Sequence, residues 1–154
     1  MLITLKDMMG IAEKEKIAIG GFNTPNLASL EAVIGAAEEE KLPVILMFAE
    51  CHDEWVSLDL IGPAMLNAAK QATVPVCVHL DHGEHLEYLK KALELGFTGI
   101  MYDGSVLPYE ENVANTKKAV EMAREHGASV EAELGSMGRR ESGANDRSGD
   151  CDET

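Results

Sequence analysis

The sequence has few cysteines, no excess of positive charge and no long hydrophobic run. Its three cysteines, Cys51, Cys77 and Cys151, lack CxxC spacing, which argues against a disulfide framework and against a thiolate zinc site. Asp and Glu outnumber Lys and Arg by 27 to 13, and the formal net charge of −14 disfavours nucleic acid and anionic membranes as partners. The longest apolar runs, such as residues 43–49, fall well short of the roughly 20 residues that span a bilayer, and the N-terminus lacks the layout of a signal peptide. We therefore expect a cytoplasmic protein with no nucleic-acid or membrane partner.

The composition is typical of one globular core. The 154 residues are 45% hydrophobic and 26% charged, which is enough for one domain and too little for two. We place this domain at residues 1–138. We predict a flexible loop or tail over residues 139–154, where small and charged residues replace the apolar pattern.

Strand-length apolar segments alternate with amphipathic helices along the chain. A short leading helix, for which Thr4 is a candidate cap, precedes the first strand. The predicted strands are residues 17–22, 43–48, 75–81, 98–102 and 128–134, and the predicted helices between them are residues 27–40, 58–71, 84–95 and 110–126. Strands that are apolar on both faces are typical of a parallel sheet covered by helices. The alternation therefore predicts right-handed βαβ units and an α/β fold.

Polar residues gather at the carboxyl ends of the predicted strands, where parallel α/β sheets bind their ligands. In chain order these ends carry Asn23, Glu50, the group His79, Asp81 and His82, the turn Asp103-Gly104-Ser105, and the pair Glu131 and Glu133. Carboxylates a few ångströms apart raise one another's pKa or recruit a cation. The pattern therefore predicts a pocket that binds a divalent metal ion.

The segment from His79 to Gly83 carries the strongest local signal. Neutral imidazole is a good zinc ligand, and a neighbouring carboxylate can complete the coordination or transfer a proton. On an extended chain His79 and Asp81 project to the same face, whereas His82 lies where the strand ends. These positions favour functional roles for Asp81 and His82. His79 fits a functional residue and a hydrogen-bonded core histidine equally well.

Glu131 and Glu133 alternate with apolar residues, so both carboxylates share one face of the fifth strand. If that face meets His82, Glu133 is a further metal ligand; otherwise the pair is a solvated edge. Other residues have simpler structural interpretations. Asp103 fits a tight turn, Cys51 and His52 fit loop residues, Trp55 fits a packing anchor, and His85 fits a solvated helix residue.

Several motifs, taken together and in this order, resemble the class II, metal-dependent ketose-bisphosphate aldolases, which act on fructose and tagatose bisphosphates. The matching segments are residues 21–23 with 26–27, 78–83, 96–98, 101–105, 110–113 and 130–135, and the resemblance extends to about Gly138. The family fold is a TIM barrel with its site at the carboxyl face of the strands. The resemblance thus implies a partial (β/α)₈ barrel of about five βα units that lacks the C-terminal units.

The resemblance also implies site residues. Asp81 would be the acid/base that transfers the proton on oxygen when the carbon–carbon bond breaks. His82 would be a zinc ligand, Glu133 would be a further or alternative metal ligand, and Asp103 would be a residue of the metal site. Asn23 would contact the substrate, and Glu141 would be the carboxylate that exchanges the carbon-bound proton of dihydroxyacetone phosphate. Zinc would act as a Lewis acid on the ketone, which removes the need for a Schiff-base lysine.

The implied function is zinc-dependent cleavage of a ketose 1,6-bisphosphate, fructose or tagatose, to dihydroxyacetone phosphate and glyceraldehyde 3-phosphate. The implied partner is a small phosphosugar, and we expect a homo-oligomer.

The chain departs from the family in length and in its last residues. A (β/α)₈ barrel takes about 250 residues. The family's last three units supply two more zinc-binding histidines and the loops that hold phosphate, whereas no histidine follows His126 here, and residues 139–142 differ from the family pattern. We expect a fragment of a longer coding sequence or a truncated gene. The alternative is an inactive half-barrel that acts only as an oligomerisation or interaction module through its open sheet edges.

Overall fold

The computed structural model describes residues 1–135 of this chain. Its elements alternate as the sequence predicts. In chain order they are α1 (Leu5–Glu15), β1 (Gly21–Asn23), α2 (Leu27–Glu40), β2 (Val44–Ala49), the 3-10 helix η1 (Glu50–Glu54), α3 (Leu58–Gln71), β3 (Val76–Gly83), α4 (Leu86–Leu95), β4 (Gly99–Tyr102), α5 (Tyr109–Glu125) and β5 (Ser129–Ala132).

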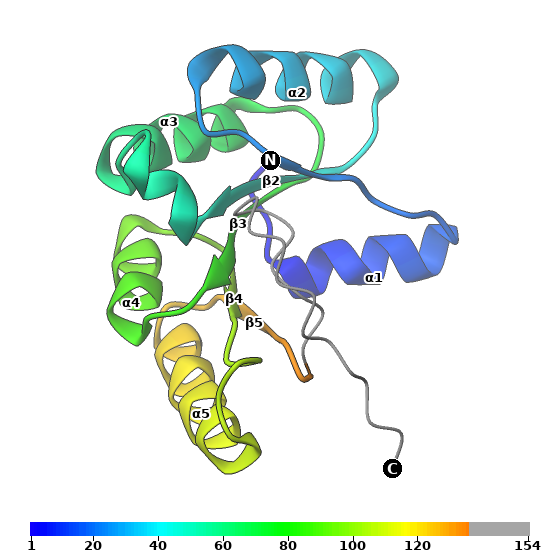
Figure 1. Ribbon diagram of the computed structural model, residues 1–154. Helices are drawn as coiled ribbons and strands as arrows, with labels where there is room; N and C mark the ends of the chain where they lie inside the picture. Colours follow the sequence, from blue (N-terminus) through cyan, green and yellow to red (C-terminus); the bar gives the residue numbers. More distant parts are fainter. Residues whose placement is uncertain (136–154) are drawn as a thin grey trace.

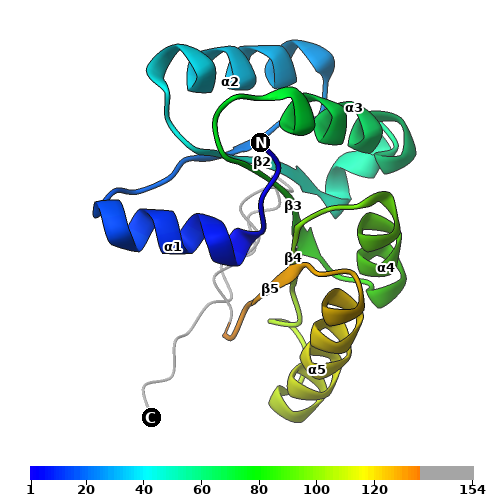
Figure 2. The same cartoon turned by 180° about the vertical axis from the view of Figure 1, so that it is seen from behind.

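All five strands form one parallel sheet in the order β1-β2-β3-β4-β5. The sheet is curved, and helices α2 to α5 lie along its outer side while α1 lies on the inner side (Figure 1). The same arrangement is seen from behind in Figure 2. This is a partial TIM-barrel-like fold, which confirms the predicted fold class.

One apolar cluster packs on each face of the sheet. On the outer face, alternate residues of the central strands, such as Leu46 and Val78, are fully buried against the helices. On the inner face, Ile45 and Cys77 pack against Met8 of α1. Because side chains alternate along a strand, the residues that follow Cys77 at every second position also face inward. Helix α1 therefore covers the amino-terminal part of the inner face, and the carboxyl-terminal part is left to polar residues.

Local sequence accounts for several helix ends. The Thr4 side chain accepts a hydrogen bond from the Asp7 N–H at 3.1 Å and caps α1. Asn26 caps α2 in the same way, through the Ser29 N–H at 2.9 Å. Gly96 ends α4 in the left-handed conformation, with φ 108°, which glycine adopts without strain.

Two strands are shorter than predicted. β1 begins at Gly21 and not at residue 17, at its first register pair with β2, Gly21 with Ile45. β5 ends at Ala132 and not at residue 134, because its last partner is Tyr102, the end of β4. Strand length in a sheet is thus set by the neighbouring strand as well as by the apolar pattern.

The segment after β2 corrects two predictions. His52 is not a loop residue: it lies buried in η1, and its Nδ1 accepts the Ala49 N–H at 3.2 Å. Trp55 is not a packing anchor, because 73% of it is exposed. Its ring stacks on the outer side of His52, at 5.4 Å between ring centroids.

The inner cluster makes Cys77 unreactive. Burial raises the pKa of its thiol to about 11, although a hydrogen bond from Thr98 acts in the opposite direction. At about pH 8 we expect a thiol reagent to modify the exposed Cys51 and to leave Cys77 unmodified in the folded protein, because the thiolate is the reactive form. Peptide mass spectrometry locates the label, and unfolding in urea should make both thiols reactive. Equal labelling of the two in the folded protein would contradict this packing.

Candidate functional site

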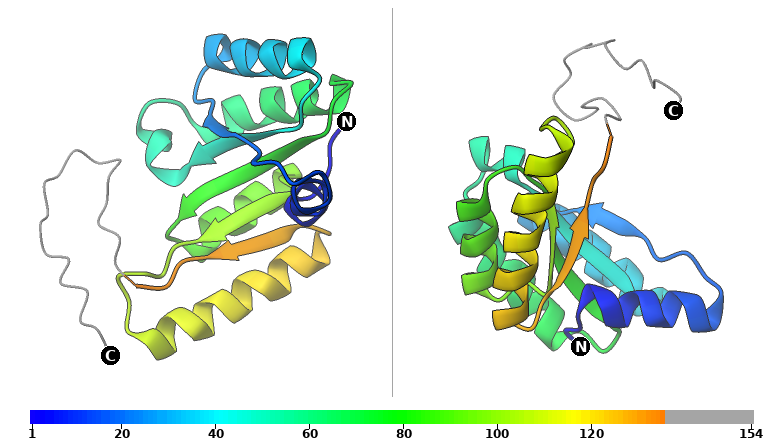
Figure 3. Two further views of the ribbon diagram at one scale, coloured as in Figure 1. Left: turned by 90° about the vertical axis from the view of Figure 1, so that its right-hand side faces the viewer. Right: turned by 90° about the horizontal axis from the view of Figure 1, so that it is seen from below.

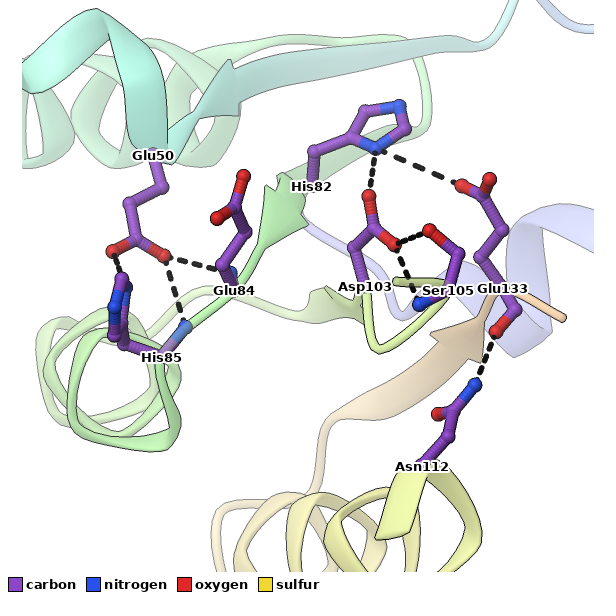
Figure 4. A network of polar contacts seen from close by, with 8 residues as sticks. All are labelled: Glu50, His82, Glu84, His85, Asp103, Ser105, Asn112 and Glu133. Carbon is purple, nitrogen blue, oxygen red and sulfur yellow. Dashed lines mark hydrogen bonds and ion pairs between the residues drawn. The ribbon is translucent and has the colours of Figure 1, made fainter. Parts of the chain in front are cut away.

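Side chains from three neighbouring strand ends meet at the carboxyl edge of the sheet. Nδ1 of His82 lies 2.9 Å from Oδ2 of Asp103 and 3.7 Å from Oε2 of Glu133 (Figure 4). One ligand atom from each of the three residues lies within 4.8 Å of the others. The structure thus brings together the residues predicted to bind metal, and that role stays a prediction.

An irregular end to β3 directs His82 toward this cluster. The register between β3 and β4 shifts between Leu80 and Gly83, and His82 adopts a left-handed backbone with φ 43°. This conformation is costly for a residue with a side chain and is found preferentially at functional sites. Gly83 is required beside it, since a Cβ there would lie 3.0 Å from the carbonyl oxygen of Met101.

Asp103 is held as an anion by its own turn. Its Oδ1 accepts hydrogen bonds from the Ser105 N–H at 3.1 Å and the Ser105 hydroxyl at 2.6 Å. Burial raises the pKa of Asp103, but the hydrogen bonds with Ser105 and His82 outweigh burial and hold the pKa below its ordinary value. The predicted tight turn and a role in the cluster therefore coexist.

Glu133 has the opposite electrostatic environment. Burial raises its pKa first, and the charges of Asp103, Glu131 and Asp81 raise it further, although His82 acts against them. An added positive charge would relieve this repulsion. The donor set of one imidazole and two carboxylates fits zinc and other first-row divalent ions.

Glu131 has a different partner from Glu133, although both side chains were predicted to share a face. His79 is buried, and its Nε2 lies 3.3 Å from Oε2 of Glu131. This contact lowers the pKa of Glu131 more than burial raises it. Gly99 leaves room for the imidazole, because a Cβ there would lie 2.6 Å from Nδ1 of His79. His79 is thus buried beside a carboxylate, and both interpretations of this residue stay open.

Two further predicted residues, Asp81 and Asn23, lie at the same edge. Asp81 is 6% exposed on β3, opposite Ala49 of β2, and directly precedes His82. Asn23 ends β1, on the far side of β2, and among the described residues its buried Oδ1 has no hydrogen-bond partner. Glu141 lies outside the described residues.

Sequence reasoning missed the role of Glu50. Its carboxylate accepts the N–H groups of Glu84 at 2.8 Å and His85 at 3.2 Å, and also contacts Nδ1 of His85 at 2.6 Å (Figure 4). Helix α4 begins at Leu86 and not at Glu84 as predicted, because the backbone of His85 is extended, with φ −112° and ψ 125°. The contact ties the end of β2 to the segment that follows His82. A bond across 34 residues leaves no local signal in the sequence.

Comparisons with a family model and with individual relatives all match this chain to fructose-bisphosphate aldolases. A family model described as "Fructose-bisphosphate aldolase class-II" matches residues 3–153. The "Probable fructose-bisphosphate aldolase" of Bacillus subtilis is 45% identical over 143 residues, which cover 91% of this chain and 50% of that protein. A "Fructose-bisphosphate aldolase" of Staphylococcus aureus is 42% identical with the same coverage.

The fold has a similar solved counterpart. The crystal structure of the YdjI aldolase from Escherichia coli K12 superimposes with a TM-score of 0.83 at 38% identity, covering 88% of this chain and 53% of that one. The chain therefore spans about half the length of the relatives it matches. None of the helices within residues 1–135 is long and apolar enough to cross a membrane.

The electrostatics of the cluster predict the effect of an isosteric change. Asp103→Asn should lower the pKa of Glu133, because it removes a negative charge that, after burial, is the main cause of the raised value. The pKa is measured in metal-free protein from the ¹³C shift of the Glu133 carboxyl carbon. Asp59→Asn, at an exposed carboxylate paired with Lys91, is the control and should leave the pKa unchanged. An unchanged or higher pKa in Asp103→Asn would show that the two carboxylates do not interact.

Proposed function

Because this chain belongs to the class II fructose-bisphosphate aldolase family, we propose that His82, Asp103 and Glu133 bind a divalent metal ion, zinc, at an aldolase active site. The reaction is the reversible cleavage of a ketose 1,6-bisphosphate, fructose or tagatose, to dihydroxyacetone phosphate and glyceraldehyde 3-phosphate. The observation that carries this proposal is the convergence of one imidazole and two carboxylates within 4.8 Å at the carboxyl edge of a parallel sheet. Catalytic zinc sites commonly have three protein ligands, and this cluster offers three.

The chain's own residues supply binding and proton transfer. A bound divalent ion supplies Lewis-acid polarisation of the ketose carbonyl. Asp81, buried beside His82, accepts the proton of the substrate hydroxyl as the neighbouring carbon–carbon bond breaks. The electron pair of the broken bond would remain on the dihydroxyacetone phosphate part of the substrate, and Glu141, in its protonated form, would donate its proton to that carbon. Asn23 binds a substrate hydroxyl through Oδ1, a buried acceptor that has no hydrogen-bond partner within residues 1–135.

The same proposal includes the substrate, the compartment and the oligomeric state. The substrate is a free phosphosugar, and the protein acts in the cytoplasm as a homo-oligomer. Sites of mixed imidazole and carboxylate donors also take cobalt, iron or manganese, so metal replacement belongs with the activity assay.

The proposal is tested by zinc content and retro-aldol turnover of the 154-residue chain with fructose and tagatose 1,6-bisphosphate. His82→Ala should lose the metal and the activity together. Asp81→Ala should keep the metal and lose turnover by about 10²–10⁴-fold, since it removes only proton transfer. Asp59→Ala is the control. Full activity in both site variants would contradict the assigned roles.

One observation favours the alternative of an inactive interaction module. A groove of about 630 Å³ lies where α1, α5 and β5 meet, and its apolar lining includes Leu5, Met9, Val120 and Val130. Helices α1 and α5 lie on opposite sides of β5, which among the described strands pairs only with β4 (Figure 3). Open strand edges and apolar grooves favour association with another subunit.

Sedimentation velocity with metal analysis separates the two functions. The alternative predicts a stable oligomer with little zinc and no turnover. If the groove forms the interface, Val120→Glu should shift the protein to monomer, because it places a charge in an apolar contact, whereas Glu121→Gln should not. Turnover in a zinc-loaded protein would exclude the alternative.

A further inference from the structure

Glu133 lies beyond the part of β5 that the sheet holds in place. The last register pair of β5 with β4 is Ala132 with Tyr102, so the strand ladder ends one residue before Glu133. The main chain there is bound instead by a helix: the carbonyl oxygen of Glu133 accepts a hydrogen bond from Nδ2 of Asn112, in α5, at 2.9 Å (Figure 4).

Burial and a second hydrogen bond hold the Asn112 side chain in place. It is 5% exposed, and its Oδ1 accepts the hydroxyl of Thr116 at 3.1 Å, which orients the amide so that its N–H group points to Glu133. A buried amide with both ends hydrogen-bonded is held in one orientation.

Asn112 also contacts the chain that follows β4. A Cβ at Gly104 would lie 2.4 Å from Oδ1 and 2.7 Å from Cγ of Asn112, so glycine is needed for the amide to fit. Gly104 directly follows Asp103. One buried side chain thus lies between the two segments that carry the carboxylates of the cluster.

We propose that Asn112 is a positioning residue that sets the separation of Glu133 from Asp103 and His82, and so sets the affinity of the cluster for a divalent ion. This inference rests on the proposed function. The two carboxylates repel each other, and Glu133 follows a strand that, within the described part of the chain, pairs only with β4. Without the Asn112 bond, the segment that carries Glu133 is free to move away, and binding the ion must then restore its position at a cost in affinity.

Asn115 offers a matched control. It lies one turn later on the same helix and also donates a hydrogen bond from Nδ2, at 3.0 Å, but to the hydroxyl of Tyr102. A variant at Asn115 therefore loses a similar bond between helix and sheet without touching the segment of Glu133.

The experiment titrates the 154-residue chain with Zn²⁺ alone, in competition with a chelating dye. Asn112→Ala and Asn112→Asp should each weaken zinc binding by about 10-fold or more, as is typical for residues that orient metal ligands. Aspartate keeps the shape and the acceptor of asparagine but loses the N–H donor. Asn115→Ala and Asn115→Asp should stay within about 2-fold of the unmodified chain. Equal weakening at both positions would indicate a general structural role and would overturn the inference.

A second readout needs no metal. The ¹³C shift of the Glu133 carbonyl should move upfield in Asn112→Ala and stay in place in Asn115→Ala, because only the first variant removes the donor. If Glu133→Gln weakens zinc binding and Asn112→Ala does not, the inference fails while the proposed function stands. If the unmodified chain binds no zinc, the metal proposal fails, and an unmoved carbonyl shift would separately show that Asn112 does not hold Glu133.

Discussion

The repulsion among carboxylates at one edge of the sheet is the constraint on which the rest of this structure depends. Asp81, Asp103, Glu131 and Glu133 end neighbouring strands of a chain whose net charge is −14. The structure compensates them unequally. Asp103 has the hydrogen bonds of Ser105, and Glu131 has His79, whereas Glu133 keeps a raised pKa beside His82. The raised pKa of Glu133 is the physical reason for proposing a cation at this cluster.

The outer face of the sheet carries most of the apolar packing, and the inner face carries the polar residues of the candidate site. The outer face is apolar and packs against helices α2 to α5, and it supplies most of the buried core. On the inner face, α1 covers an apolar cluster that contains Met8, Ile45 and Cys77. Parallel topology brings the carboxyl ends of the described strands to the same edge of the sheet (Figure 3). The polar residues that follow these strands therefore gather outside the apolar core. The site therefore has its own set of supporting contacts.

Those supporting contacts come from segments distant in sequence. Glu50 binds the main chain just after β3, and Asn112 binds the main chain just after β5. Between them, His82 adopts a left-handed backbone at the shift in register with β4. Hydrogen bonds to loop backbone, rather than the strand ladder, thus set the geometry at the point where the strands end.

Much of the fold could be predicted from the sequence because it depends on local patterns. Apolar periodicity predicted the alternation of strands and helices, the caps at Thr4 and Asn26 fix helix starts, and glycine ends α4. The residue types at the strand ends also predicted which side chains gather at this edge of the sheet, and their role at a metal site stays a prediction. Tertiary structure alone decided where β1 starts and where β5 ends, since strand length depends on pairing, and which acid faces which imidazole. Those pairings join residues 21 or more positions apart, and their geometry follows from sheet register and from one left-handed residue, neither of which a local pattern determines.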